Sequence, residues 1–487
     1  MNIETVIFFS IDSLRADCAP YQKQPFLEPK LPRLWTPTLR HLMYHASCFT
    51  NVYSSAVFTP PAHATLFTGA YQPDHHVREF YYRGQTLNPK LPTLAEFFKK
   101  QGFATCAFTD MAHLFSALGL LRGFDQVSNK DSAFFHHMTT WKRSKRFIFI
   151  HLLDVHTPYL FSLSDLYVDN NDYYKRITRE IRNHGGHAPR GIGHPDPYVL
   201  WNTFVQLPTV QSSQSRLLPL YIEGVNKFDK GRLRIFLDQL NQHTNGEKTV
   251  MFLFSDHGEG QASHLSPTLF RHGPHLADDV LHIPLMISSP SFRQTRNNQL
   301  LSLRDVYDLT RVLLETPTQE AVDAYQNPDR FIYAESFEYR KSGLFTNPDR
   351  AYAYEVRDRQ KTDYYLYERV IRTPQNKLTV WFRPELFFGS DTRFRSLKKA
   401  KKNLKTMCSA YPIKTSLLLR LLLIVIALCS SRWKKAWTWF IRRRLSPMFR
   451  YEPIKDGSVN ELFGAMLRIN HVRNWPKDLS LLQMMLS

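Results

Sequence analysis

Cysteine is scarce in this chain of 487 residues, with five copies that show no Cys-x-x-Cys spacing: Cys18, Cys48, Cys106, Cys408 and Cys429. An odd number without paired spacing argues against a disulfide framework and a structural zinc site, and it fits a reducing compartment. The N-terminus also lacks the basic stretch, apolar core and cleavage site of a signal peptide. We therefore expect a cytoplasmic protein.

Acidic residues are nearly missing from one part of the chain. The formal net charge is +20, and residues 391–450 hold 16 Lys or Arg but a single acid, Asp391. The basic character therefore belongs to a C-terminal segment and not to the rest of the protein. Hydrophobic residues make up 43% of the chain and aromatic residues 14%, which is enough to build a sizeable core.

Three short apolar runs, at 5–11, 146–153 and 249–254, predict strands buried on both faces of a mainly parallel sheet. Segments with helical periodicity alternate with them, and the longest predicts one amphipathic helix over 221–240. We therefore expect an α/β fold, with a mainly parallel central sheet flanked by helices. The Tyr, Phe and Val residues of 331–388 alternate with polar ones, which predicts a small antiparallel C-terminal sheet.

Polar side chains follow each of the three buried runs: Asp12, then Asp154 and His156, then Asp256 and His257. The carboxyl ends of parallel strands are where open α/β sheets bind ligands. Two carboxylates, an imidazole and a nearby threonine oxygen would suit one divalent ion, such as zinc, manganese, magnesium or calcium. The alternative for the first aspartate is a helix cap.

In segment 58–69, Thr59 stands before two prolines, and the residues from Ala62 predict a helix that ends at Gly69. A hydroxyl at a helix N-terminus faces unpaired N–H groups and the positive end of the dipole, which favours an anionic ester. A metal beside Thr59 would lower the pKa of its hydroxyl and make it a nucleophile. His156 and His272 could then hold the transferred group or protonate the leaving oxygen. The alternative is an ordinary Pro-Pro turn.

The order of these motifs resembles the sulfatase branch of the alkaline-phosphatase superfamily over residues 2–315. The matching stretches are 11–17, 59–69, 154–159, 255–259, 272–273 and 282–285. The resemblance implies a metal-dependent hydrolase or transferase of phosphate or sulfate esters. It implies Asp12, Thr59, Asp256 and His257 as metal-site residues, and Thr59, His156 and His272 as catalytic residues. It leaves His63, Arg15 and His275 as possible substrate contacts, with a supporting role as the alternative for Arg15; His275 is also an alternative to His272.

The chain departs from the sulfatase pattern at the nucleophile. Sulfatases carry Cys or Ser there, oxidised to formylglycine, and Thr59 cannot give that aldehyde because its β-carbon bears a methyl group. His63 stands where sulfatases keep Arg, and Ser13 where they often keep a second metal-binding Asp. The site is more similar to that of phosphoethanolamine transferases and lipoteichoic acid synthases, which favours a phosphodiesterase or phosphotransferase. The alternatives are a sulfuric ester hydrolase in the strict sense and a non-catalytic binding protein of the same fold.

We expect three parts: a catalytic domain at 1–320, a small α+β subdomain at 321–390, and a basic, partly apolar helical tail at 391–487. The apolar run 417–429 has 13 residues and contains Arg420, whereas a spanning helix needs ~20. Tryptophans and cations follow it, so segment 416–444 suits peripheral contact with anionic lipid at the inner face of a membrane, near lipid-linked or glycan substrates. The alternatives are a packed helix and a nucleic-acid patch; we expect no nucleic acid because no recognition fold accompanies the segment.

Overall fold

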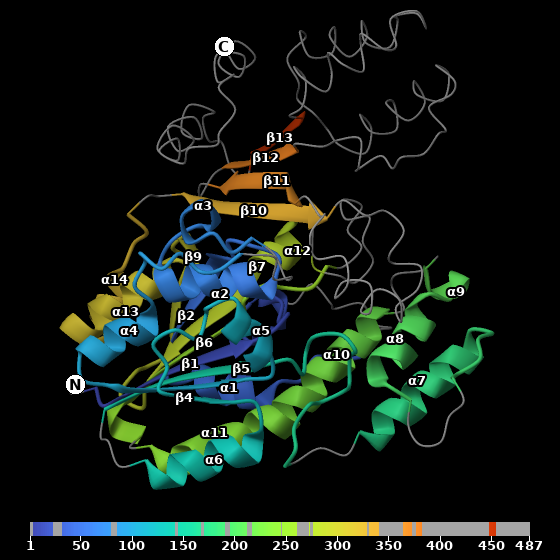
Figure 1. The fold of residues 1–487 in the computed structure, drawn as a ribbon, viewed down its shortest axis with the longest axis horizontal. Coiled ribbons are helices and arrows are strands. Elements are labelled where there is room, and N and C mark those ends of the chain that lie inside the picture. The colour runs from blue at the N-terminus through green and yellow to red at the C-terminus, as the bar shows by residue number, and fades with distance from the viewer. Residues whose placement is uncertain are drawn as a thin grey trace, which may run out of the picture. The chain divides into compact units, whose positions relative to one another are not determined.

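The computed structural model of the chain describes residues 3–22, 32–78, 85–141, 145–166, 170–189, 195–211, 217–244, 246–260, 272, 276–328, 331–339, 364–372, 376–381 and 448–453 (Figure 1). The chain divides into two compact units, one made of 1–328 with 339–365 and the other of 329–338 with 366–487.

The first unit is built on a nine-stranded sheet in the order β4-β3-β5-β1-β6-β7-β2-β8, with β9 paired to β2. Its strands are β1 (Thr5–Ile11), β2 (Ala46–Tyr53), β3 (Ala104–Thr109), β4 (Gln126–Ser128), β5 (Arg146–Leu152), β6 (Thr249–Phe254), β7 (His282–Ser288), β8 (Thr295–Asn297) and β9 (Leu301–Ser302). Only β7 runs antiparallel to its neighbours, β6 and β2. The predicted mainly parallel sheet is confirmed.

The three predicted apolar strands lie side by side, with β1 parallel to both β5 and β6. Ile11 is level with Leu152, and Ser10 with Phe254, so the three strands end at the same edge. Every residue of β1 is buried. Because the strands end together, the polar residues that follow them are brought to one place.

Helices cover both faces of this sheet (Figure 1). Ile7, Phe9 and Ile11 of β1 belong to one apolar cluster, whereas Val6 and Phe8 belong to the other. The first cluster includes residues of α1 (Pro37–Met43), α6 (Asp131–Thr140), α7 (Asn171–Asn183), α8 (Pro197–Val205), α9 (Pro208–Gln211), α10 (Leu217–Phe228) and α11 (Arg234–His243). The second includes residues of α2 (Thr59–Thr68), α4 (Leu94–Lys100), α5 (Ala112–Ala117), α13 (Asp305–Glu315) and α14 (Gln319–Ala324). The remaining short turns of helix are η1 (Ala16–Cys18), α3 (Gln72–His75), η4 (Gly246–Lys248) and α12 (Asp278–Leu281).

The single helix predicted over 221–240 is wrong. The structure has α10 and α11 joined by a π-helical turn, η3 (Asp229–Leu233), in which Gly231 leaves helical geometry at φ −99° and ψ −106°. The apolar periodicity continues on both sides, so it gave no sign of the break. The turn carries Arg232, whose role is described below.

The second unit contains a four-stranded sheet in the order β10 (Ile332–Tyr339), β11 (Tyr364–Arg372), β12 (Asn376–Trp381) and β13 (Met448–Pro453). β12 is antiparallel to β11 and to β13, as predicted for this part of the chain. β13 was not predicted, because it lies inside the segment expected to be helical. There Phe449 pairs with Val380 and Tyr451 with Leu378.

No helix within the described ranges is both long and apolar enough to cross a membrane. The segment 416–444, for which we predict membrane contact, lies outside those ranges.

Candidate active site

Four predicted site residues meet at the carboxyl edge of the large sheet. Asp12 follows β1, Asp256 and His257 follow β6, and Thr59 is the first residue of α2; all four side chains are buried. The ligand atoms of the two aspartates and the histidine lie within 4.8 Å of one another. The Thr59 hydroxyl donates a hydrogen bond to Asp12 Oδ2 at 3.0 Å, and its oxygen is 3.3 Å from His257 Nε2.

Hydrogen bonds tie the loops after β1 and β6 together. Ser255 Oγ donates to the Ile11 carbonyl at 2.6 Å and accepts from the Leu14 N–H at 3.0 Å. Ser13 donates through Oγ to Asp12 Oδ1 at 2.7 Å and through its N–H to Asp256 Oδ1 at 3.3 Å. The two aspartates are therefore held in place by bonds within the protein.

Gly258, next to His257, is required by its surroundings. Its N–H donates to the Val280 carbonyl at 2.6 Å, and a Cβ at this position would lie 2.3 Å from the Asp279 carbonyl oxygen. Its own carbonyl accepts a hydrogen bond from His257 Nδ1 at 2.9 Å. That bond fixes the tautomer, and burial lowers the pKa of His257, so the neutral Nε2 presents its lone pair to the site.

The pKa values of the two buried carboxylates are shifted in opposite directions. Burial and the neighbouring Asp12 charge raise the pKa of Asp256. Burial opposes ionisation of Asp12 too, but the nearby charge of His156 and the hydrogen bond from His151 hold its pKa well below the usual range. Asp256 Oδ2 is buried and has no hydrogen-bond partner among the described residues. An unpaired carboxylate oxygen beside a second carboxylate and a neutral imidazole fits a divalent cation.

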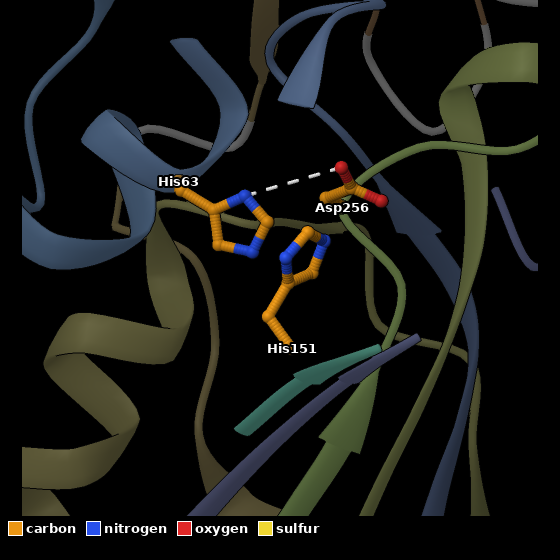
Figure 2. Close-up of side chains that lie close together, drawn as sticks. All are labelled: His63, His151 and Asp256. Carbon is orange, nitrogen blue, oxygen red and sulfur yellow. Dashed lines mark ion pairs between the residues drawn. The ribbon is translucent and has the colours of Figure 1, made fainter. Parts of the chain in front are cut away.

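His63 and His151 lie beside Asp256 (Figure 2), and His63 Nδ1 is 3.9 Å from Asp256 Oδ2. The ligand atoms of these three residues also lie within 4.8 Å of one another. However, both rings have partners at both nitrogens. His63 Nδ1 donates to the Thr59 carbonyl at 2.8 Å, and its Nε2 is 3.0 Å from Ser10 Oγ. His63 is fully buried, which favours support of Thr59 over the predicted substrate contact.

His151 also contacts the Asp12 carboxylate. Its Nε2 lies 3.3 Å from Asp12 Oδ2, and its Nδ1 lies 3.0 Å from Thr109 Oγ1. Burial disfavours the charged imidazole, but the Asp12 carboxylate outweighs this and raises the pKa of His151. Sequence reasoning missed this residue because it sits inside an apolar strand; a lone histidine in a run of Phe, Ile and Leu was the available signal.

His156 and His272 form a row of imidazoles with His257. The His272 ring stacks on His257 with centroids 4.3 Å apart, and the His156 ring is 4.9 Å from His272. His156 Nδ1 donates to the Thr157 carbonyl at 2.5 Å, and His272 Nδ1 lies 3.6 Å from the buried Glu259 carboxylate. The row leads from the candidate metal ligands Asp12, Asp256 and His257 to the partly exposed His156. His275 lies outside the described residues.

Arg15 is bonded within the protein. Its guanidinium donates to both carboxylate oxygens of Asp17, at 2.9 and 2.6 Å, and to the Glu259 carbonyl at 2.8 Å. Its side chain is 7% exposed. These contacts favour the supporting role for Arg15, and a substrate contact stays a prediction.

The start of α2 has fewer N–H donors than we expected. Pro60 and Pro61 have none, and the Ala62 N–H already donates to the Phe58 carbonyl at 3.2 Å. Neutralisation of an anionic ester here therefore depends on a cation and on the imidazoles more than on the helix backbone.

A buried ionic cluster around Arg232 lies behind the His156 loop. The guanidinium donates to three aspartates from three elements, at 3.0 Å to Asp110, 2.6 Å to Asp131 and 2.7 Å to Asp154. Asp154, which follows β5, thus faces this arginine and is not among the metal-ligand groups found within the described residues. The sequence did not reveal the cluster because its cation lies far along the chain, in the π-helical turn.

Comparison with known proteins identifies the family. The family model described as Sulfatase matches residues 4–315, so the chain belongs to the sulfatase family, within the alkaline-phosphatase superfamily. The predicted resemblance is confirmed. Hydrolases of this family act on sulfate or phosphate esters and typically bind a divalent metal. A search of curated proteins found no match.

Solved structures with the same fold are distant in sequence. A Bacteroides thetaiotaomicron protein from a core genetic locus for metabolism of multiple glycosaminoglycans is 14% identical with a TM-score of 0.52, covering 78% of this chain and 87% of its own. A 2-O GAG sulfatase is 14% identical with a TM-score of 0.50, covering 84% and 92%. A protein solved with its substrate D-glucosamine-2-N,6-O-disulfate is 12% identical with a TM-score of 0.50, covering 85% and 99%. At these identities the likeness establishes the fold alone.

Proposed function

We propose that this protein is a metal-dependent phosphodiesterase or phosphotransferase that uses Thr59 as its nucleophile. The observation that carries the proposal is the position of the Thr59 hydroxyl, 3.0 Å from Asp12 Oδ2 and 3.3 Å from His257 Nε2, at the centre of the metal-ligand cluster. A sulfate ester is the second candidate, because the family model and the structural neighbours are those of sulfatases.

Asp12, Asp256 and His257 would hold the ion, with the Thr59 oxygen beside it. When bound, the ion would supply positive charge next to the threonine hydroxyl and favour its deprotonation. Asp12 Oδ2 accepts the hydroxyl hydrogen in the present arrangement, so the same carboxylate orients the oxygen for attack. His63 donates a hydrogen bond to the Thr59 carbonyl and so fixes the start of α2.

His156 and His272 are proposed to act on the side of the transferred group that faces away from Thr59. Their rings stand in line with His257 along the row of imidazoles. As an imidazolium, each can donate a hydrogen bond through Nε2 to a non-bridging oxygen, and one can give that Nε2 proton to the leaving alcohol oxygen. The acceptor of the transferred group, water or another alcohol, decides between hydrolase and transferase.

Phosphate is favoured over sulfate by the chemistry of the nucleophile. Thr59 cannot be oxidised to the formylglycine on which sulfatases depend, whereas its hydroxyl can attack phosphorus directly. Lipid-linked or glycan phosphodiesters at the inner face of a membrane remain our predicted substrates, on the basis of segment 416–444.

The test is an activity panel of phosphate monoesters, phosphate diesters and sulfate esters, each with zinc, manganese, magnesium and calcium. We expect turnover of a phosphodiester with at least one metal, and removal of the metal by a chelator should abolish it. Turnover of sulfate esters alone would establish the second candidate. A protein that binds no divalent ion and turns over no ester would be a non-catalytic member of the fold.

A further inference from the structure

Glu259 is a buried carboxylate beside the candidate site that the proposed chemistry does not use. Its side chain is 1% exposed, and neither of its two carboxylate oxygens makes a hydrogen bond to another described residue. A buried carboxylate is costly when nothing replaces its lost hydration, so a group of this kind indicates a partner within reach.

The partner that the structure brings within reach is the His272 imidazole. Its Nδ1 lies 3.6 Å from Glu259 Oε1 and has no hydrogen-bond partner among the described residues either. This distance exceeds the ~2.7–3.2 Å of a formed N–H···O bond, but bonds between catalytic groups often tighten only when the substrate binds. Burial opposes ionisation of Glu259, yet the neighbouring His272 outweighs burial and lowers the pKa of Glu259. A charged acceptor therefore faces an imidazole nitrogen that can donate to it.

The backbone that carries the Glu259 carboxylate is fixed by the protein. The Glu259 carbonyl accepts a hydrogen bond from Arg15 Nη1 at 2.8 Å, and the same guanidinium is held by Asp17. The N–H of the preceding Gly258 donates to the Val280 carbonyl at 2.6 Å. The position of the carboxylate is thus set by contacts within the protein.

The His272 ring is confined by its aromatic neighbours. It stacks on His257 with centroids 4.3 Å apart and an interplanar angle of 30°, and the Phe58 ring meets it edge-on at 6.1 Å. These contacts restrict the plane of the ring, but they do not select which nitrogen serves the reaction centre. Glu259 supplies that selection, because a carboxylate attracts the Nδ1–H and leaves Nε2 to the substrate.

We propose that Glu259 is the positioning residue of His272: its carboxylate accepts a hydrogen bond from Nδ1–H and so directs Nε2–H toward the oxygens of the transferred group. The inference rests on the proposed function and deepens it, because it makes the two outer histidines unequal. His156 gives its Nδ1 hydrogen to the neutral Thr157 carbonyl, whereas His272 faces a carboxylate. A charge-assisted bond of this kind orients an imidazole more firmly than a neutral one does.

The test is a double-mutant cycle on the binding of inorganic phosphate, measured by calorimetry on the metal-loaded full chain. Glu259→Gln keeps the shape of the side chain and removes its charge; it is made in the wild type, in His272→Ala and in His156→Ala. Elemental analysis first shows that all variants hold the same metal content. The control for the exchange itself is Glu223→Gln on α10, whose side chain is 35% exposed.

We expect Glu259→Gln to weaken phosphate binding about tenfold in the wild type and in His156→Ala, as coupled neighbours do. In His272→Ala it should not weaken binding, because there the carboxylate has no imidazole to orient. Glu223→Gln should bind phosphate like the wild type.

Two results would overturn the inference: no loss on Glu259→Gln in the wild type, or the same loss in all three backgrounds, since the carboxylate would then not act through His272. Turnover of a phosphodiester by the wild type together with either result would retain the proposed function without the Glu259–His272 pair. The expected coupling in a protein that turns over no phosphate or sulfate ester would instead retain the pair and refute the proposed function.

Discussion

The two ends of the imidazole row differ in how firmly the protein holds them. At the inner end, His257, Asp12 and Asp256 are fully buried, and hydrogen bonds fix their carboxylates and the histidine ring. At the outer end, His156 is partly exposed, and its Nδ1 donates a hydrogen bond to the carbonyl of the neighbouring Thr157. The difference teaches that the protein fixes the geometry of the inner end by itself, whereas the outer end is open to solvent.

Apart from removal of the Thr59 hydroxyl, the largest effect is expected from removing a carboxylate at the inner end. Asp256→Asn keeps the shape of the side chain but removes the charge from the buried, unpaired oxygen. We expect metal affinity to fall by more than ~100-fold, because loss of an outer partner alone costs ~10–100-fold. Elemental analysis of the dialysed protein measures this, with Asp238→Asn on α11 as a matched control. An unchanged metal content in Asp256→Asn would remove Asp256 from the site.

The next prediction concerns the effect of the Arg232 ionic cluster on the free energy of unfolding. Arg232→Met leaves three buried aspartates without their cation and should lower the free energy of unfolding by about 3–5 kcal/mol. The control is Arg176→Met. Arg176 and its partner Glu223 are roughly one-third exposed, at 32% and 35%. That exposed pair should contribute at most ~1 kcal/mol. Urea unfolding monitored by circular dichroism compares the two, and equal losses would show that the cluster is not a special support.

A smaller effect is expected from the outer partner of Asp12. His151→Ala removes the imidazole 3.3 Å from Asp12 Oδ2 and should lower metal affinity by ~10–100-fold. Titration with a competing chelator measures the affinity, and His113→Ala, which changes an exposed histidine, provides the control. Wild-type affinity in His151→Ala would mean that Asp12 is held by its other bonds alone.

The smallest effect for a single side chain is expected in segment 416–444. A truncation after residue 388 would also remove β13 from the second sheet, so substitution is the better test. Changing Arg442, Arg443 and Arg444 to Gln should weaken binding to anionic vesicles, by about 1 kcal/mol for each cation near the surface. Vesicle sedimentation at low and high salt measures this. Equal pelleting of both proteins on anionic and neutral vesicles would contradict membrane contact.

The sequence predicted the site residues that have a local signal and missed those that depend on contacts between distant elements. Asp12, Asp256 and His257 were found because each follows an apolar strand, and Thr59 because prolines and Gly69 mark its helix. Such signals are local. Arg232 was missed because its three acids come from other elements, and the antiparallel direction of β7 was not predicted because apolar content does not encode strand direction.

The central claim is tested most directly at Thr59. Thr59→Ala and Thr59→Ser are to be assayed on the best phosphodiester from the panel, after elemental analysis shows that both hold the same metal content as the wild type. We predict that Thr59→Ala lowers kcat/KM on the order of 10⁴-fold or more, as loss of a nucleophile does, whereas Thr59→Ser retains most of the activity. Turnover by metal-loaded Thr59→Ala at the wild-type rate would contradict the account, because another group or water would then be attacking the ester.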